Sequence, residues 1–462
     1  MESDTATPES PVDAPAETTP DRPLWRDHDH VAWLAADTSW QFGASIRAFA
    51  MLLIAYSVTG SYAQAGLLST VSTIAEAVTT LPGGVLVDRW DRRLSLTVSG
   101  TTRFLVYGGA ALAWWNGTLT IGVLYAVGIA SGIIGGLFAT AASAALKSVV
   151  ATRDLPRAVA VNQGRNAAVD LSAAPIAGAL MGISTALPFA ATALGAVLQV
   201  IGTWAIRTDL HPDPHPSGGE RTQRRGGSGD PDRPSGNNGR ARPGLPALRG
   251  LLAGFTIYRD IPVLLRMLPA VVLVNSGMVA LYTGIQLILQ GQGVQPWRIG
   301  LLDTAVGVGM LAGSFVAPHL IRRIPTGRLS VTLFAACALV LMPLAFSQRV
   351  PLVLTILTIV GLMLPALNGA MGGYFQSRIP GHLQGRAMST MRLVQDSVPS
   401  LMPALVGFGL QGIGAGPTML AVSVLFPAAA VLILTHRELR SLPVPSKWDL
   451  TSDGAGAATV GG

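Results

Sequence analysis

Long apolar segments dominate the sequence and constrain its fold more than any other feature. Crossing the hydrocarbon core of a bilayer takes about 20 apolar residues in a helix. Only 12% of the residues are charged, whereas soluble domains carry about 25%. The sequence therefore predicts an all-α integral membrane protein with twelve transmembrane helices. These are expected at residues 38–59, 64–87, 94–115, 119–146, 158–183, 187–207, 263–289, 297–320, 328–347, 351–377, 387–410 and 416–435.

A polar, glycine-rich stretch divides these segments into two groups of six. It includes "HPDPHPSGGERTQRRGGSGDPDRPSGNNGRARPG", which is too polar to pack and is typical of a flexible linker. Apolar residues at helical spacing then predict an interfacial helix before the second group. The expected domains are a disordered N-terminal tail at 1–37, a six-helix half at 38–207, the linker at 208–245, the interfacial helix plus the second six-helix half at 246–437, and a C-terminal tail at 438–462.

Basic residues in the short loops predict the orientation, because cytoplasmic loops are enriched in Lys and Arg. They follow the second, fourth, eighth and tenth segments, whereas opposite loops such as "TGSYAQ" and "GIGAGPT" carry no charge. Both termini and the linker are therefore predicted to be cytoplasmic. The high ratio of Arg to Lys is typical of a GC-rich bacterial genome, so we expect a bacterial inner-membrane protein.

Several function classes are disfavoured by the sequence. The net charge of +7 comes from short basic clusters between apolar segments, whereas nucleic-acid binders gather basic residues on one soluble face. Cys337 is the single cysteine, and His28, His30, His211 and His215 lie in polar stretches that contain Pro or Asp and offer no metal-ligand pattern, so neither a metal site nor a cofactor is expected. The sequence carries no His–Glu metal pattern, no Ser–His–Asp set and no phosphate-binding loop, which disfavours an enzyme.

The two halves repeat each other. "GLLST" at 66–70 matches "GLLDT" at 300–304, an offset of 234 residues. "RAVAVNQGRNAAVDLSAAPIAG" at 157–178 matches "RAMSTMRLVQDSVPSLMPALVG" at 386–407, an offset of 229 residues. Parallel six-helix repeats are a transporter architecture in which the substrate cavity lies between the halves.

The stretch "GGVLVDRWDRR" at 83–93 resembles the loop between helices 2 and 3 of the major facilitator superfamily. "DRWDRR", "TGSYAQAGLLS" and "GRAMST" further resemble its drug–proton antiporter branch, which holds macrolide-efflux proteins and the enterobactin exporter. The similarity covers about residues 38–437. Asp91 stands where many members have glycine, and the antiporter pattern Gly-Pro-x-x-Gly is reduced here to "APIAG". The positions that fit the motif are Gly84, Leu86, Asp88, Arg89, Arg92 and Arg93.

The resemblance implies that Gly84, Asp88, Arg89, Arg92 and Arg93 form a gating motif. Asp88 is expected to lock the cytoplasmic gate against the eleventh helix, near "QGRAMS". The glycine pair that opens the motif is expected to let two helix ends approach closely. For Arg92 and Arg93, a role as orientation signals alone is the alternative.

Ionisable residues inside apolar segments are costly, and therefore each is a functional candidate. At 1.5 Å per residue, Arg47 and Glu76 lie about 13 and 15 Å from the cytoplasmic ends of their segments. An ion pair at matched depth is predicted, in which Glu76 takes up a proton when cargo competes for Arg47. A static pair that only fixes helix packing is the alternative. The full set is Arg47, Glu76, Arg103, Arg165, Asp170, Asp303, Arg392 and Asp396.

Asp396 is the second candidate proton carrier. Arg392 lies four residues earlier, so a local pair between these two side chains is the competing prediction. In the resembling fold, helices 1, 4, 7 and 10 line the cavity. Candidate cargo contacts by position are Tyr56, Tyr125, Asn275, Tyr282, Gln286 and Asn368.

The sequence and the resemblance together predict a secondary active transporter. It is expected to export amphipathic small molecules, drugs or siderophores, in exchange for protons by alternating access. An uptake carrier for a small metabolite, or a non-transporting membrane sensor with the same fold, are the alternatives. The expected partners are the lipid bilayer, the cargo and protons, with no nucleic acid, and a monomer is expected.

Overall fold

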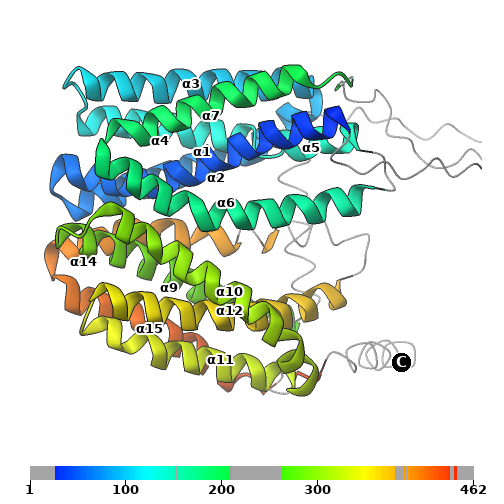
Figure 1. The fold of residues 1–462 in the computed structure, drawn as a ribbon. Coiled ribbons are helices and arrows are strands. Elements are labelled where there is room, and N and C mark those ends of the chain that lie inside the picture. The colour runs from blue at the N-terminus through cyan, green and yellow to red at the C-terminus, as the bar shows by residue number, and fades with distance from the viewer. Residues whose placement is uncertain are drawn as a thin grey trace, which may run out of the picture.

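The structure is a computed structural model, and it describes residues 27–150, 154–208, 210, 262–379, 390–391, 394–437 and 442–444. The described regular structure is helical throughout (Figure 1). The expected linker, the interfacial helix and most of both tails lie outside the described residues. So does "QGRAMS", the expected partner of the gating motif.

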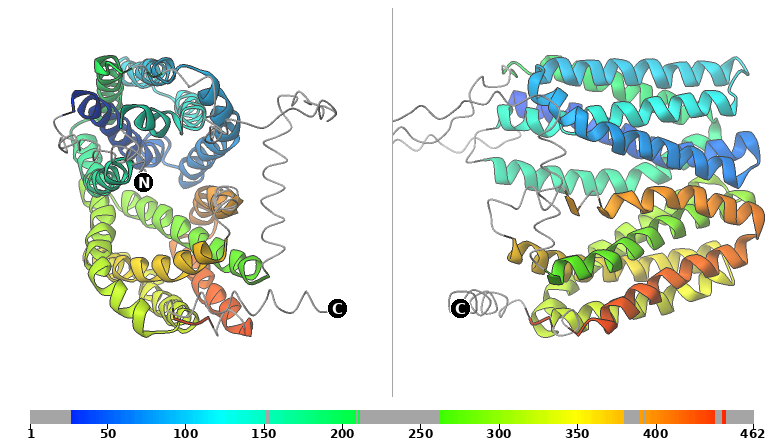
Figure 2. Two further views of the ribbon diagram at one scale, coloured as in Figure 1. Left: turned by 90° about the vertical axis from the view of Figure 1, so that its right-hand side faces the viewer. Right: turned by 180° about the vertical axis from the view of Figure 1, so that it is seen from behind.

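The helices form two bundles that lie side by side (Figures 1 and 2). The first bundle holds α1 (His28–Thr59), α2 (Tyr62–Arg89), α3 (Arg92–Trp115), α4 (Ile121–Leu137), α5 (Ala141–Val149), α6 (Leu155–Ile183) and α7 (Ala186–Ala205). The second holds α9 (Pro262–Gly291), α10 (Pro296–Arg323), α11 (Thr326–Leu341), η2 (Met342–Ala345), α12 (Val350–Arg378), η4 (Pro399–Leu401), α14 (Met402–Gly412) and α15 (Ala415–Thr435).

Ten stretches among the described helices are long and apolar enough to cross a membrane. They correspond to ten of the twelve expected spans. The span expected at 94–115 is α3, which has 24 residues but is less apolar, because it contains Arg103 and several hydroxyl side chains. The span expected at 387–410 is described only in part, as η4, α14 and the residues just before them.

The first helix begins earlier than predicted. The sequence predicts a disordered tail at residues 1–37, but α1 starts at His28 and buries Trp33 against its neighbours. Asp27 caps this start by accepting a hydrogen bond from the Asp29 backbone at 3.0 Å. The Asp29 carboxylate in turn accepts from the Thr208 backbone at 2.8 Å, which ties the start of α1 to the end of α7. The polar residues 27–30 concealed this extra length of helix in the apolar pattern.

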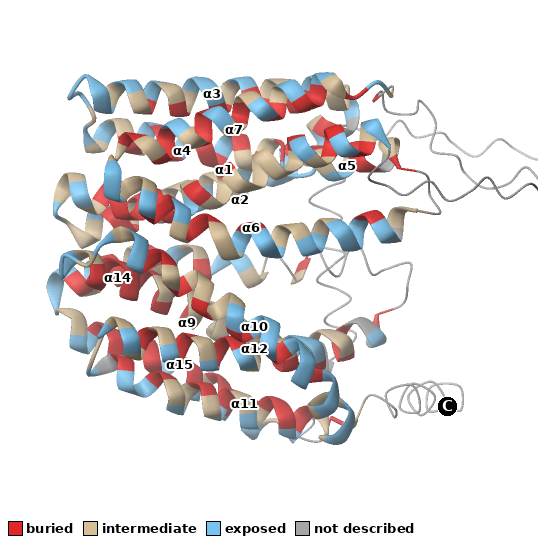
Figure 3. Ribbon diagram, viewed as in Figure 1, coloured by how far each residue is buried: buried red, intermediate tan, exposed pale blue. Residues whose placement is uncertain are grey.

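The two ends of the molecule differ in which helix termini and connections they hold. At one end, the linker end, α1 begins, α7 ends, α9 begins and α15 ends (Figure 1). At the other, the far end, short turns join α1 to α2 and α9 to α10. Buried residues gather along the faces that helices turn toward one another, whereas outward faces carry exposed apolar side chains (Figure 3). Phe315 is 80% exposed and Leu339 is 71% exposed, as expected for surfaces that face lipid.

The halves meet along two seams, α2 against α14 and α6 against α10 (Figure 2). A Cβ at Gly66 of α2 would lie 2.0 Å from the carbonyl oxygen of Pro403 in α14. A Cβ at Gly300 of α10 would lie 2.5 Å from the carbonyl oxygen of Ala174 in α6. Gly66 and Gly300 are the equivalent glycines of the "GLLST" and "GLLDT" repeats. The repeat that the sequence predicts is therefore present in space as two equivalent seams.

The second pair of repeats completes these seams. A Cβ at Gly178 would lie 2.3 Å from the Pro296 carbonyl oxygen, and one at Gly407 would lie 2.4 Å from that of Tyr62. Backbone contacts this close are possible only because glycine has no side chain. All four glycines lie toward the far end, where the halves are closed against each other.

Candidate functional site

The structure brings Arg47 of α1 and Glu76 of α2 together, as their matched depth predicts. Arg47 Nη2 lies 3.8 Å from Glu76 Oε2. The arginine side chain is 19% exposed and the glutamate side chain 44% exposed. Glu76 therefore remains accessible from one side, which a group that exchanges protons or competes for cargo requires.

A second arginine, Arg103 of α3, joins this pair. Its guanidinium group lies 3.8 Å from the centre of the Trp40 ring, and Arg103 is only 5% exposed. It is within electrostatic range of both Arg47 and Glu76. Among the described residues, Arg103 Nη1 has no hydrogen-bond partner. The cluster of Arg47, Glu76 and Arg103 thus sets two guanidinium groups against one carboxylate.

Glycines of α4 position Glu76. A Cβ at Gly132 would lie 2.2 Å from the Ser72 carbonyl oxygen, and one at Gly136 would lie 2.3 Å from that of Glu76. The α2 and α4 backbones therefore run in direct contact. A Cβ at Gly135 would lie 3.3 Å from the Glu76 carboxyl carbon, so the carboxylate rests on a surface without side chains. Gly132 and Gly136 are four residues apart, which is the small-xxx-small pattern of close membrane-helix packing.

Arg165 and Asp170 of α6, whose role the sequence does not indicate, both contact α1. Arg165 forms a largely buried ion pair with Asp37 and donates to Asn166 Oδ1 at 2.6 Å. Asp170 accepts a hydrogen bond from Ser45 Oγ at 3.1 Å. Periodicity alone did not reveal these pairs, because their members are more than 120 residues apart in the chain.

Asp303 of α10 lies where the two halves meet. The Tyr282 hydroxyl donates to the carbonyl oxygen of Leu302, the residue before Asp303, at 3.2 Å. The next residue, Thr304, donates to the Leu171 carbonyl oxygen across the α6–α10 seam at 3.1 Å. Asp303 and Asp170 are the chain neighbours of these two bonded residues, so one acid from each half lies beside this seam.

The gating motif makes several contacts within the first half. Asp91 caps α3 by accepting from the Arg93 backbone at 2.7 Å, which gives this departure from the family pattern a structural role. The Arg93 guanidinium donates to the carbonyl oxygens of Ile206 at 2.6 Å and Thr208 at 3.1 Å, beyond the end of α7. Arg92 donates to the hydroxyl of Ser148 in α5.

The close approach expected of both glycines in the motif involves only one. A Cβ at Gly83 would lie 2.5 Å from the Leu137 Cα, so α2 and α4 touch there. Gly84 faces open space with nothing within 4 Å, and the packing prediction for it is wrong. The physical reason is the helical rotation of 100° per residue, which turns adjacent positions to different neighbours. Arg89 is exposed, and Asp88 lies in the last turn of α2.

The predicted cargo contacts separate into different environments. Asn275 and Asn368 line a common cavity of about 250 Å³ in the second half. Tyr56 instead stacks on Tyr62 at the far end, with ring centres 4.7 Å apart. The other three also contact neighbouring helices or are buried: Tyr125 donates to the Gln64 carbonyl at 3.4 Å, Tyr282 donates to the Leu302 carbonyl at 3.2 Å, and Gln286 is 9% exposed.

Asp396, the second candidate proton carrier, is exposed and follows Gln395, which lines the same 250 Å³ cavity. Arg392, its expected local partner, lies outside the described residues. The pairing therefore stays a prediction, whereas the position beside the cavity keeps Asp396 a candidate.

Comparison with known proteins identifies the class of protein to which this geometry belongs. The family model described as the Major Facilitator Superfamily matches residues 38–403. The chain is 24% identical over 427 residues to the multidrug efflux pump Tap of Mycobacterium tuberculosis and of Mycobacterium bovis. That match covers 88% of this chain and 93% of the relative.

Solved structures show the same fold. A bacterial homologue of the iron transporter ferroportin, in an inward-facing state, matches with a TM-score of 0.59 at 16% identity, over 88% of this chain and all of that one. A bacterial homologue of the human lysosomal transporter Spinster, inward-facing and unoccupied, matches with a TM-score of 0.62 at 14% identity, over 88% of this chain and 95% of that one. The chain is thus a multi-pass membrane protein that belongs to the Major Facilitator Superfamily of transporters.

Proposed function

We propose that this protein is a secondary active transporter that exports amphipathic small molecules in exchange for protons. The observation that carries the proposal is the ion pair of Arg47 and Glu76 beside the buried Arg103. The similarity to a multidrug efflux pump supports export over uptake. We propose a bacterial inner membrane as its location, with the linker end in the cytoplasm, and no enzymatic activity of its own.

The pair couples cargo to protons because cargo and the proton occupy the site in turn. While Glu76 is ionised, it neutralises one of the two guanidinium groups, and cargo that enters from the cytoplasm offers hydrogen-bond acceptors to Arg47. After the halves rock and cargo leaves on the outside, Glu76 accepts a proton from that side. After the halves rock back, the proton is released to the cytoplasm and Arg47 re-forms the pair before the next cargo binds.

The far-end seams supply the conformational half of the cycle. Among the described residues, the hydrogen bonds between the two halves join α2 to α14 and α6 to α10. This arrangement supports a state closed at the far end, in which cargo enters from the linker end. Rocking of the two halves would then open the seams and release cargo outside.

The test uses inside-out membrane vesicles with an acidic lumen and a lumenal pH dye. Erythromycin, ethidium and a catecholate siderophore are added in turn to vesicles that contain the wild-type protein, Glu76→Gln or Glu76→Asp. We expect at least one compound to release lumenal protons with wild type and Glu76→Asp. With Glu76→Gln we expect proton release at the level of empty vesicles.

A second readout separates coupling from folding. Exchange of labelled cargo for unlabelled cargo at equal pH needs binding and rocking but no proton transfer. We expect Glu76→Gln to retain this exchange. Proton release by Glu76→Gln equal to wild type would refute the role of Glu76, and cargo accumulation in the opposite direction would establish an uptake carrier. No movement of any compound by the folded protein would favour the membrane sensor.

A further inference from the structure

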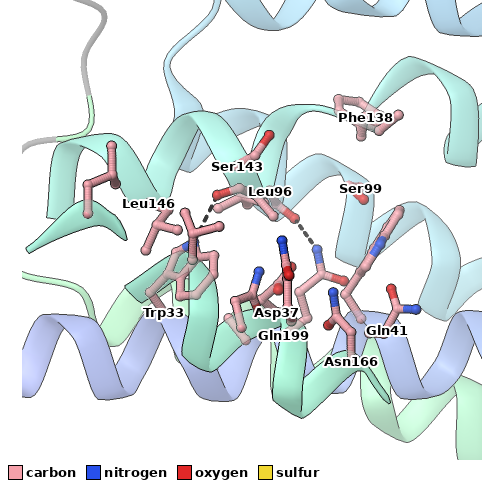
Figure 4. A pocket seen from close by; sticks show the side chains of 18 residues that line it. Trp33, Asp37, Gln41, Leu96, Ser99, Phe138, Ser143, Leu146, Asn166 and Gln199 are labelled. Carbon is pink, nitrogen blue, oxygen red and sulfur yellow. Dashed lines mark hydrogen bonds between the residues drawn. The ribbon is translucent and has the colours of Figure 1, made fainter. Parts of the chain in front are cut away.

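A cavity of about 610 Å³ lies inside the first half, between residues of α1, α3, α5, α6 and α7 (Figure 4). The wall uses residues 33–41 of α1, residues 155–166 of α6 and Gln199 in the second half of α7. Neither Arg47 nor Glu76 lines it. Its volume is within the range of about 300–1,000 Å³ that is typical of small-molecule sites.

Three buried oxygen atoms on the wall of this cavity lack hydrogen-bond partners among the described residues. They are Gln199 Oε1 of α7, Ser99 Oγ of α3 and Asn162 Oδ1 of α6. Gln199 is 1% exposed, and its Nε2 donates to the Leu96 carbonyl at 3.2 Å, which fixes the amide (Figure 4). Buried polar atoms are normally hydrogen-bonded, so three together call for a polar partner. The two amide oxygens can only accept and therefore call for hydrogen-bond donors, whereas the Ser99 hydroxyl can donate or accept.

The charges around the cavity cancel. Asp37 is the carboxylate on the wall, and Arg165 already holds it in an ion pair whose members are 11% and 12% exposed. Behind the wall, Arg103 lies against the Trp40 ring, and Asp170 accepts a hydrogen bond from Gln41 of the wall at 3.4 Å. Two carboxylates are thus set against two guanidinium groups, so the wall favours neither a cation nor an anion. The cavity therefore suits an uncharged ligand.

Aromatic rings form the apolar part of the wall. Trp33, Trp40 and Phe138 all line the cavity. Trp33 Nε1 donates to the Ala142 carbonyl at 2.9 Å, which holds its ring in one orientation (Figure 4). Rigid aromatic walls with a few fixed polar atoms are the usual composition of a site for a ring-containing small molecule.

We infer that this cavity is a binding site for an uncharged amphipathic molecule that carries a ring and donates hydrogen bonds through hydroxyl or amide groups. Gln199 and Asn162 accept those hydrogen bonds, and the tryptophans contact the ring. Its place as the site that captures cargo before Arg47 is reached rests on the proposed function. Binding itself does not, because it needs neither a proton gradient nor Glu76.

The experiment is equilibrium dialysis of radiolabelled chloramphenicol against the full-length protein in lipid nanodiscs. Chloramphenicol is uncharged and carries a ring, one amide N–H and two hydroxyls. The variants are Gln199→Met, which removes the acceptor at similar size, and Ser143→Phe, which fills the cavity from an exposed wall position. The matched control is Gln64→Met, the same substitution at an exposed position of α2 outside the cavity.

We expect saturable binding by wild type and Gln64→Met, an affinity about tenfold weaker for Gln199→Met, and no binding by Ser143→Phe. Tetraphenylphosphonium, a cation without donors, should not displace chloramphenicol. Melting temperature and gel filtration establish that each variant is folded, and if Gln199→Met does not fold, Ser143→Phe decides. Absence of saturable binding up to the solubility limit would overturn the inference. Wild-type affinity in folded Gln199→Met and Ser143→Phe would also overturn it, and so would displacement of chloramphenicol by tetraphenylphosphonium.

Because binding is measured at equilibrium, its failure is distinguishable from failure of the proposed function. Loss of proton coupling in vesicles with chloramphenicol binding intact would refute only the antiporter. Coupled transport without binding in this cavity would refute only the site.

Discussion

The side chains at the junction of α2 and α3 make three different contacts, although in the sequence they form one cluster of charged residues. Asp91 caps α3, Arg92 donates to Ser148 and Arg93 donates to two backbone carbonyls beyond α7. Arg89 is exposed. Orientation signals need only positive charge, whereas Arg93 also satisfies carbonyl groups that a helix end leaves unpaired.

Replacing Arg93 by Ala therefore tests whether this residue stabilises the fold. We expect the free energy of unfolding to fall by about 1.5–3 kcal/mol, the usual worth of hydrogen bonds to a charged group. Arg89→Ala is the matched control and should change it by about 0.5 kcal/mol or less. Thermal unfolding in detergent measures both. Equal, small effects would mean that Arg93 serves only as an orientation signal.

At the scale of elements, the contact of α2 with α4 decides where Glu76 lies. Gly132 and Gly136 bring the two backbones together over Ser72 and Glu76. Within a membrane there is little hydrophobic force between helices, so close packing of small residues is what holds them. The position of the carboxylate is thus a consequence of glycines on the neighbouring helix.

A methyl group at Gly132 should separate α2 from α4. We expect Gly132→Ala to lower the free energy of unfolding by about 1–3 kcal/mol, as overpacking does in tight interiors. Gly122→Ala on the same helix is the control, because a Cβ there would lie 3.8 Å from its nearest neighbour, an ordinary contact. Thermal unfolding compares the two, and equal stability of both variants would contradict the role of this packing.

At the scale of the whole molecule, the far end is closed by two equivalent seams built from repeated sequence. Gly66 and Gly300 occupy equivalent positions, and so do Gly178 and Gly407. Each brings one backbone against a carbonyl of the other half. In the proposed transport cycle, this two-fold repeat would let both seams open together.

Replacing Gly66 and Gly300 by Leu should hold the far end open. Spin labels at Asn116 and Arg349, which are exposed positions in different halves, report the distance between the halves at the far end by double electron–electron resonance. The labelling background is Cys337→Ser, since Cys337 is the only cysteine. We expect longer distances in the double variant, because a leucine side chain cannot occupy a gap that excludes a single Cβ.

The control for the seam is Gly108→Leu in α3, where nothing lies within 4 Å of an added Cβ. Its distance distribution should match that of the unsubstituted protein. A double variant that still shows the short distances would mean that the seams do not set the closure of the far end.

What the sequence determined by itself follows from local patterns. Apolar length predicts the ten spans found among the described helices, the repeats predict two equivalent halves, and matched depth predicts the contact of Arg47 with Glu76. These three predictions depend on the spacing of residues along the chain, which fixes the length of a helix and the depth of a residue in the bilayer. That spacing can be read from the sequence without knowing which helices pack together.

Tertiary structure alone decided the contacts between distant segments. The sequence did not show that Arg165 pairs with Asp37, that Arg93 donates to the end of α7, or that Gly83 and not Gly84 touches α4. It also did not show the cavity beneath Gln199. The rotation of each helix about its axis and the identity of the helix beside it set these contacts, and both depend on how all helices pack together. A periodic pattern shows which face of a helix is apolar. It does not show which residue of another helix that face contacts.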